Sequence, residues 1–146
     1  MLNSNDKHEL KIRRLHPLIG AEVTNVDFKE PLQASIVEKI HQAWMDYQIL
    51  VFPSQKISDE QHVAVTRNFG EPEIFHQSII KSKFVKEIFR VSNTDEDGRL
   101  MPQSHPIQQQ LSSAKKWHTD SSYRSIPAMG SLLHGVEVSR TGGLTC

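Results

Sequence analysis

The sequence predicts an α+β or mainly β fold in which two early helices precede several strands. Two stretches that alternate apolar and polar residues, 10–15 and 21–26, open the chain, and a helical period follows from residue 31. Further apolar runs, at 87–91 and 129–138, come late and are separated by long polar connections. Because helices do not alternate regularly with strands, this order argues against a βαβ series.

The first elements follow from local patterns. Residues 10–15 alternate apolar and basic side chains, which is typical of a half-buried strand, and residues 21–26 form a second short strand. Pro31 is expected to open a helix, because its missing N–H costs little at the first helical position. Apolar residues at helical spacing predict one buried face on that helix: Leu32, Ile36, Val37, Ile40, Ala43 and Trp44.

The next two elements are a strand and a capped helix. Residues 49–52 are four consecutive apolar residues, which predicts a strand buried on both faces. Ser58 and Gln61 have the spacing of a capping box, so a helix is expected to start there and run to Phe69. Gly70 is the expected C-cap of this helix.

The second half of the chain is predicted to contain strands and long connections. Residues 87–91 are expected to form a strand, and the acidic stretch that ends in glycine at 95–98 predicts a turn. Residues 101–113 are polar and proline-containing, which favours a long loop of the kind that often acts as a lid. Residues 129–138 are predicted to form a final strand.

Length and composition narrow the function classes. The 146 residues fit a single domain, and 17 basic residues balance 17 acidic ones, which argues against a dedicated nucleic-acid binder. The single cysteine, Cys146, excludes an internal disulfide and a cysteine-based zinc cluster. The longest apolar run has four residues and no secretory signal is visible, so we expect a cytoplasmic protein without a membrane partner.

The most informative stretch for chemistry is residues 117–123. In an extended strand the side chains of His118 and Asp120 leave the same face, where an imidazole and a carboxylate make two adjacent ligands for a divalent metal. A facial triad of two histidines and one carboxylate needs this pair and one distant histidine. The pattern alone also occurs by chance in many proteins. The hydroxyls of Ser121 and Ser122 either orient Asp120 or are simply solvated.

An ordered set of motifs resembles the TauD/TfdA family of Fe(II)- and 2-oxoglutarate-dependent dioxygenases. The block over residues 32–70 is similar to the N-terminal portion of that family, and residues 92–99 look more like its 2,4-dichlorophenoxyacetate dioxygenase branch. The motifs are Phe-Gly-Glu-Pro at 69–72, Trp-His-Thr-Asp-Ser-Ser-Tyr at 117–123, Gly-Ser-Leu-Leu at 130–133 and Thr-Gly-Gly-Leu-Thr at 141–145.

The resemblance implies a double-stranded β-helix (jelly roll) with flanking helices, incomplete in this chain. Residues 1–146 would then be the N-terminal part of a single dioxygenase domain. His118 and Asp120 match the iron ligands, and Thr145 matches the threonine that contacts 2-oxoglutarate; Leu144 stands where the family usually has aspartate. The distal histidine ligand and the arginine that binds the co-substrate lie further C-terminal in the family.

The implied function is hydroxylation of a small, anionic organic substrate, with Fe(2+), 2-oxoglutarate and O2 as cofactor and co-substrates and release of succinate and CO2. His76 and Asn93 are the predicted substrate contacts, and the family resemblance favours a homo-oligomer. Two alternatives remain open. One is a catalytically incomplete, truncated remnant that lacks the distal histidine and arginine. The other is a serine hydrolase, although no Gly-x-Ser-x-Gly elbow is present.

Overall fold

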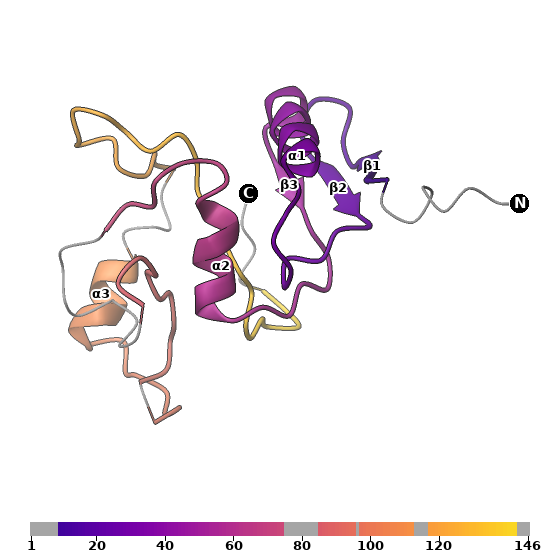
Figure 1. The fold of residues 1–146 in the computed structure, drawn as a ribbon. Coiled ribbons are helices and arrows are strands. Elements are labelled where there is room, and N and C mark those ends of the chain that lie inside the picture. The colour runs from indigo at the N-terminus through magenta and orange to yellow at the C-terminus, as the bar shows by residue number, and fades with distance from the viewer. Residues whose placement is uncertain (1–8, 75–84, 96, 113–116, 143–146) are drawn as a thin grey trace, which may run out of the picture. The chain divides into compact units, whose positions relative to one another are not determined.

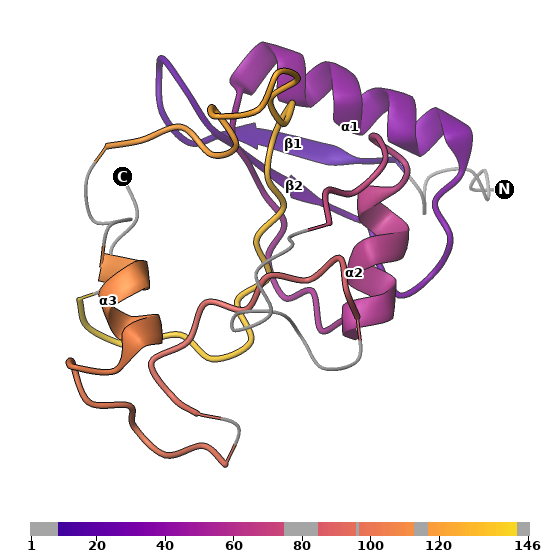
Figure 2. The same cartoon turned by 90° about the vertical axis from the view of Figure 1, so that its left-hand side faces the viewer.

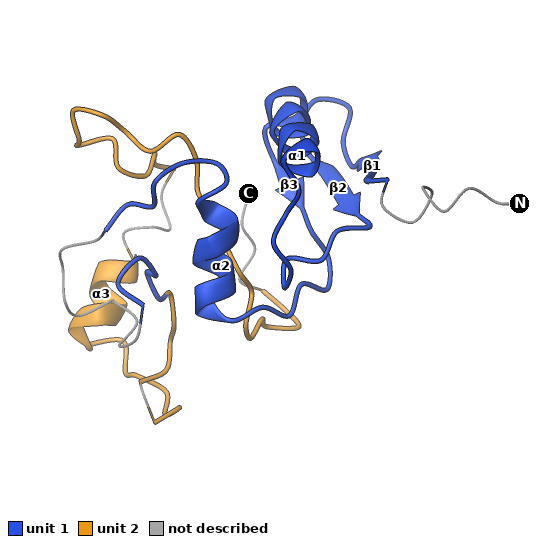
Figure 3. Ribbon diagram, viewed as in Figure 1, with its two compact units in different colours: residues 1–90 blue, residues 91–146 orange. Residues whose placement is uncertain are grey.

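A computed structural model describes residues 9–74, 85–95, 97–112 and 117–142 of the chain. The chain divides into two compact units, Met1–Arg90 and Val91–Cys146 (Figures 1 and 3). The first unit contains the described strands and two of the three described helices, and the second contains the third helix. Within these residues no helix has both the length and the apolar character that crossing a membrane requires.

The first unit is built on a small mixed sheet in the order β1-β2-β3. Strand β1 (Lys11–Arg14) pairs antiparallel with β2 (Ala21–Thr24), and β2 pairs parallel with β3 (Leu50–Val51). The two strands expected at the start of the chain are therefore confirmed. Ala21 and Val23, on one face of the central strand, are fully buried, as the period of two requires.

The expected burial of the two outer strands is wrong. All four residues of β1 are exposed, and β3 has only two residues, of which Val51 is 43% exposed instead of buried on both faces. Both strands lie at edges of the described sheet, where a strand has a partner on one side only. Apolar runs predict burial only when neighbours cover both faces, and here they do not.

Helix α1 (Ala34–Tyr47) runs alongside the sheet (Figure 2), and its buried residues are Ile40 and Ala43. It begins at Ala34, with Gln33 as N-cap, and not at Pro31 as predicted. Its C-terminus is tied to β2 by hydrogen bonds of the backbone: the Gly20 N–H donates to the carbonyl of Tyr47 at 2.8 Å. The helix face predicted from spacing is thus confirmed at its centre.

A single glutamine side chain joins the segment after β2 to the segment after β3. Gln55 accepts a hydrogen bond from the Phe28 N–H at 3.0 Å and donates one to the carbonyl of Val26 at 3.0 Å. The Phe28 and Phe52 rings, 4.8 Å apart, pack beside this link. The link satisfies backbone groups that have no sheet partner, which buried loops otherwise leave unpaired.

Helix α2 (Asp59–Thr66) confirms the predicted capping box. The Ser58 hydroxyl accepts from the Gln61 N–H, and the Gln61 side chain accepts from the Ser58 N–H at 2.9 Å. The helix ends earlier than expected, with Arg67 as C-cap, so the predicted role of Gly70 as C-cap is wrong. A three-residue turn follows, and the Arg67 side chain pairs with Glu87 at 3.0 Å.

In the second unit the predicted turn at 95–98 is confirmed. Thr94 and Leu100 pair as an isolated antiparallel bridge, and the Asp95 carboxylate accepts from the Arg99 N–H at 2.8 Å across the turn. Gly98 has a φ of 78°, which glycine adopts without steric cost. The turn therefore forms from local hydrogen bonds alone, as an aspartate followed by glycine predicts.

The predicted loop over 101–113 is wrong because residues 106–112 form helix α3 (Pro106–Ser112). Pro106 occupies the first helical position, where proline is favoured, and the glutamines and leucine that follow are good helix formers. His105 supports the start of the helix: its imidazole Nδ1 accepts from the Ile107 N–H at 3.3 Å. Proline is common in loops, but at the first helical position it suits a helix start.

The strands predicted at 87–91 and 129–138 are also wrong: the first range contains a single bridge residue, Phe89, and the second contains no described strand. Leu133, Val136 and Val138 are at least 75% exposed, and no described strand pairs with residues 129–138. An apolar run becomes a strand only when a partner supplies hydrogen bonds. The described sheet is small and mixed, so the jelly roll itself stays a prediction.

Replacing the helix cap tests the local stability of the first unit. Ser58→Ala removes the acceptor for the Gln61 N–H, so we expect the free energy of unfolding to fall by about 1 kcal/mol. Thermal and urea unfolding followed by circular dichroism measures this loss. Ser58→Thr keeps the hydroxyl and is the matched control; equal stability of the alanine and threonine variants would contradict the capping role.

The hydroxyl of Ser58 also affects the pKa of the Glu60 carboxylate. The Ser58 hydroxyl donates to Glu60 Oε2 at 2.7 Å, and this hydrogen bond lowers the pKa of Glu60 below its ordinary value. A lowered folded-state pKa stabilises the fold above the unfolded-state pKa, and this contribution disappears as pH falls through the folded-state value. We expect the pKa of Glu60 to rise in Ser58→Ala and not in Ser58→Thr, as measured by NMR titration. An unchanged pKa in the alanine variant would contradict this cause.

Candidate metal centre

The segment that carries the predicted metal ligands is irregular, and it is not the extended strand that we expected. No strand is present over residues 117–123, and a turn starts at Asp120. Ser121 adopts a left-handed φ of 55°, and its carbonyl accepts from the Arg124 N–H at 3.1 Å. A left-handed residue other than glycine is uncommon, and here it reverses the chain directly after the carboxylate.

The structure nevertheless brings the side chains of His118 and Asp120 together. The imidazole Nε2 of His118 lies 3.2 Å from Oδ1 of Asp120. The two side chains are 48% and 64% exposed. The two side chains thus lie close together without the strand that the prediction assumed, and their role as metal ligands stays a prediction.

The second oxygen of Asp120 has its own partner. The hydroxyl of Ser131 donates to Oδ2 of Asp120 at 3.2 Å, across a loop of ten intervening residues. Ser131 was not among the predicted site residues. No periodicity or motif spacing links a serine to an aspartate eleven positions earlier, so only the folded structure reveals the contact.

Nε2 of His118 and Oδ1 of Asp120 are placed to occupy two neighbouring coordination positions of one divalent transition metal. Two ligand atoms bound at about 2.1 Å and at a right angle to each other lie about 3 Å apart, close to the separation of Nε2 and Oδ1. Imidazole and carboxylate are two of the ligand types of the facial triad. Among the described residues no group of three or more histidine, cysteine, aspartate or glutamate side chains gathers, so this pair supplies two ligands.

The other predicted site residues are not brought to this pair. His76 and Thr145 lie outside the described residues. Asn93 is exposed at the base of the turn at 95–98, and its carbonyl accepts from the Met101 N–H at 2.9 Å. None of the hydrogen bonds between described residues joins Asn93 to His118 or Asp120. Its predicted substrate contact stays a prediction.

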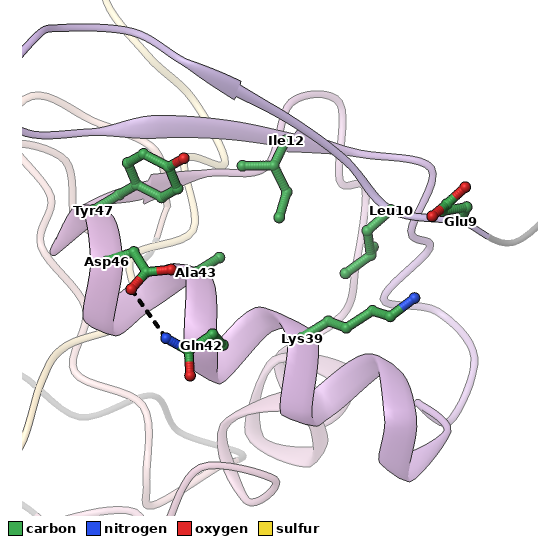
Figure 4. A pocket seen from close by; sticks show the side chains of 8 residues that line it. All are labelled: Glu9, Leu10, Ile12, Lys39, Gln42, Ala43, Asp46 and Tyr47. Atoms are coloured by element: carbon green, nitrogen blue, oxygen red, sulfur yellow. Dashed lines mark hydrogen bonds between the residues drawn. The ribbon is translucent and has the colours of Figure 1, made fainter.

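A separate open groove lies between β1 and α1 in the first unit (Figure 4). Its volume is about 330 Å³, and the Asp46 carboxylate at its edge accepts from Gln42 at 3.0 Å. It includes none of the predicted site residues. The groove is lined by charged, polar and apolar side chains: Glu9, Leu10, Ile12, Lys39, Gln42, Ala43, Asp46 and Tyr47.

Comparison with known proteins gives a consistent result. The family described as "Taurine catabolism dioxygenase TauD, TfdA family" matches residues 11–146. An alpha-ketoglutarate-dependent 2,4-dichlorophenoxyacetate dioxygenase of Cupriavidus pinatubonensis is 32% identical, over 90% of this chain and 47% of the relative. An (S)-phenoxypropionate/alpha-ketoglutarate-dioxygenase of Sphingobium herbicidovorans is 31% identical, over 92% and 43%. The chain thus spans less than half of either curated relative.

A solved structure is similar to this chain in fold as well as in sequence. The crystal structure of AAD-2 in complex with Mn(II) and N-oxalylglycine superposes with a TM-score of 0.69 at 30% identity, covering 82% of this chain and 39% of that one. The sequence match over residues 11–146 and this structural match agree with each other. The chain belongs to the TauD/TfdA family of dioxygenases, and its relatives include the 2,4-dichlorophenoxyacetate branch.

Proposed function

We propose that the whole protein is an Fe(II)- and 2-oxoglutarate-dependent dioxygenase that hydroxylates a small, anionic organic substrate and releases succinate and CO2. The observation that carries this proposal is the 3.2 Å approach of His118 Nε2 to Asp120 Oδ1 in a chain of this family. The names of the curated relatives support dependence on 2-oxoglutarate. The Mn(II) held by the solved relative supports a divalent metal.

Each member of the pair has a distinct role in this proposal. His118 offers the lone pair of a neutral imidazole, and Asp120 offers a negative charge that offsets part of the charge of a divalent cation. With one further ligand, such a triad leaves three metal positions for exogenous molecules. Bound ferrous iron would supply the activation of O2, whereas the protein would supply binding and orientation.

Co-substrate and substrate would be held by residues outside the pair. Thr145 is proposed to contact the carboxylate of 2-oxoglutarate, as its place in the Thr-Gly-Gly-Leu-Thr segment indicates. His76 and Asn93 are proposed to contact the substrate, and the exposed side chain of Asn93 is consistent with this role. The relatives named for phenoxyacetate and phenoxypropionate derivatives support a small carboxylic acid as substrate.

The geometry argues against a serine hydrolase. In such a triad the histidine would lie between the carboxylate and the nucleophilic hydroxyl, with one ring nitrogen toward each. Here the Ser131 hydroxyl donates to Asp120 Oδ2. The catalytically incomplete remnant would keep the same two ligands but lack the distal histidine. Tight stoichiometric metal binding would therefore contradict the remnant alternative.

Removing the imidazole tests the metal pair. In His118→Ala we expect the whole protein to lose Fe(II)-dependent consumption of 2-oxoglutarate, and Mn(II) affinity to fall by more than about 100-fold, because a direct ligand is lost. Calorimetry and a 2-oxoglutarate assay measure the two effects. His41→Ala, an exposed histidine on α1, is the matched control and should behave like the wild type. Undiminished turnover in His118→Ala would overturn the proposal.

Removing the charge of the carboxylate gives an independent test. Asp120→Asn preserves the side-chain shape but leaves a neutral amide, so Mn(II) affinity should again fall by more than about 100-fold. Asp97→Asn is the matched control, since Asp97 lies in the same unit and only pairs with Arg99 at the exposed surface. The remnant alternative, which lacks the distal histidine ligand, predicts no tight Mn(II) binding by the wild type and no 2-oxoglutarate consumption. Equal Mn(II) affinity of both aspartate variants would show that Asp120 is not a ligand.

A further inference from the structure

The carboxylate of Asp120 is held at both oxygens by different partners. Oδ1 faces His118 Nε2 at 3.2 Å, and Oδ2 accepts the Ser131 hydroxyl at 3.2 Å. The imidazole comes from two residues before Asp120, whereas the hydroxyl comes from eleven residues after it. Two contacts from different parts of the chain therefore define the plane of one carboxylate.

Without the Ser131 hydroxyl, the contact with His118 would be the other described side-chain contact that orients the Asp120 carboxylate. The Asp120 side chain is 64% exposed, and an exposed carboxylate turns freely about its last torsion angle, which has only broad minima. A hydrogen bond to an ionised acceptor is stronger than a neutral one, so the Ser131 hydroxyl restricts this rotation. The restricted carboxylate directs Oδ1, and not Oδ2, to the side where His118 lies.

The same contact has a consequence for metal binding. Carboxylates bind cations through one oxygen or through both. An oxygen already engaged with a hydroxyl is less available to a cation, so the contact favours binding through Oδ1 alone. Binding through one oxygen uses one metal position, whereas binding through both oxygens would take one further position that the co-substrate or O2 needs.

We propose that Ser131 is a positioning residue that fixes Asp120 for binding a divalent metal through Oδ1. This inference rests on the proposed function, because it assigns Ser131 a role toward the metal that His118 and Asp120 would hold. Outer partners of metal ligands orient them and raise affinity, and their removal typically weakens metal binding 10- to 100-fold. Ser131 does not contact the reacting groups in this role and acts through Asp120.

The nearer Ser122 is less suited to this role. Ser122 is exposed, and none of the hydrogen bonds between described residues joins it to Asp120. The hydroxyl that the structure describes on the Asp120 carboxylate is that of the more distant Ser131.

The experiment compares side chains of matched shape at position 131 in the whole protein. Threonine keeps the hydroxyl and valine has nearly the same shape without it, and the exposed position accommodates both. We expect Ser131→Ala and Ser131→Val to bind Mn(II) about 10- to 100-fold more weakly than the wild type, and Ser131→Thr to bind normally. Electron paramagnetic resonance of free Mn(II) measures the affinity, and circular dichroism verifies folding. Ser122→Ala is the control and should bind as the wild type does.

The outcomes separate this inference from the function on which it rests. If His118→Ala loses Mn(II) and both Ser131→Ala and Ser131→Val bind like the wild type, the positioning role is overturned and the metal pair stands. Equal weakening in Ser131→Val and Ser131→Thr also overturns it, because the hydroxyl would not matter. If the wild type does not bind Mn(II), or His118→Ala binds it unchanged, the proposed metal centre fails and the inference fails with it.

Discussion

The approach of one imidazole nitrogen to one carboxylate oxygen is the interaction on which the functional account depends. His118 and Asp120 are two residues apart, and the turn that starts at Asp120 keeps Nε2 and Oδ1 at 3.2 Å. In the absence of a cation this arrangement is an exposed pair that contributes little to stability. Its value lies in pre-arranging two donor atoms at the spacing that one octahedral cation requires of neighbouring ligands.

The first unit, residues 1–90, is stabilised by interactions of a different kind from the His118–Asp120 pair. Its central strand buries Ala21 and Val23 completely. The N–H groups of Gly20 and Ala21 donate to the carbonyls of Tyr47, the last residue of α1, and of Ile49, which precedes β3. Gln55 then joins the two segments that leave the sheet. This unit therefore depends on apolar burial and backbone hydrogen bonds, whereas the described part of the second unit depends mainly on turns and side-chain contacts. The metal pair belongs to the second.

Features encoded by neighbours in the sequence were predictable. The capping box of Ser58 and Gln61, the strands β1 and β2 and the turn at 95–98 each follow from contacts or periods within a few residues. The His118–Asp120 pair was found in the same way, although the backbone that arranges it is a turn. Helix α3 was not predictable in this way, because proline is common both in loops and at the first position of a helix, and Pro106 is the first residue of α3.

Features that depend on distant partners were not predictable. The burial of Val51 depends on what lies beside β3, and the apolar run at 129–138 has no pairing strand among the described residues. The contact of Ser131 with Asp120 joins positions that no sequence pattern connects.

A crystal structure of the whole protein, grown without oxygen in the presence of Mn(II) and 2-oxoglutarate, tests the central claim most directly. We expect an anomalous scattering peak at bonding distance from both Nε2 of His118 and Oδ1 of Asp120. A metal bound at another site would contradict this expectation. So would a structure without metal at this site in which the side chains of His118 and Asp120 point away from each other.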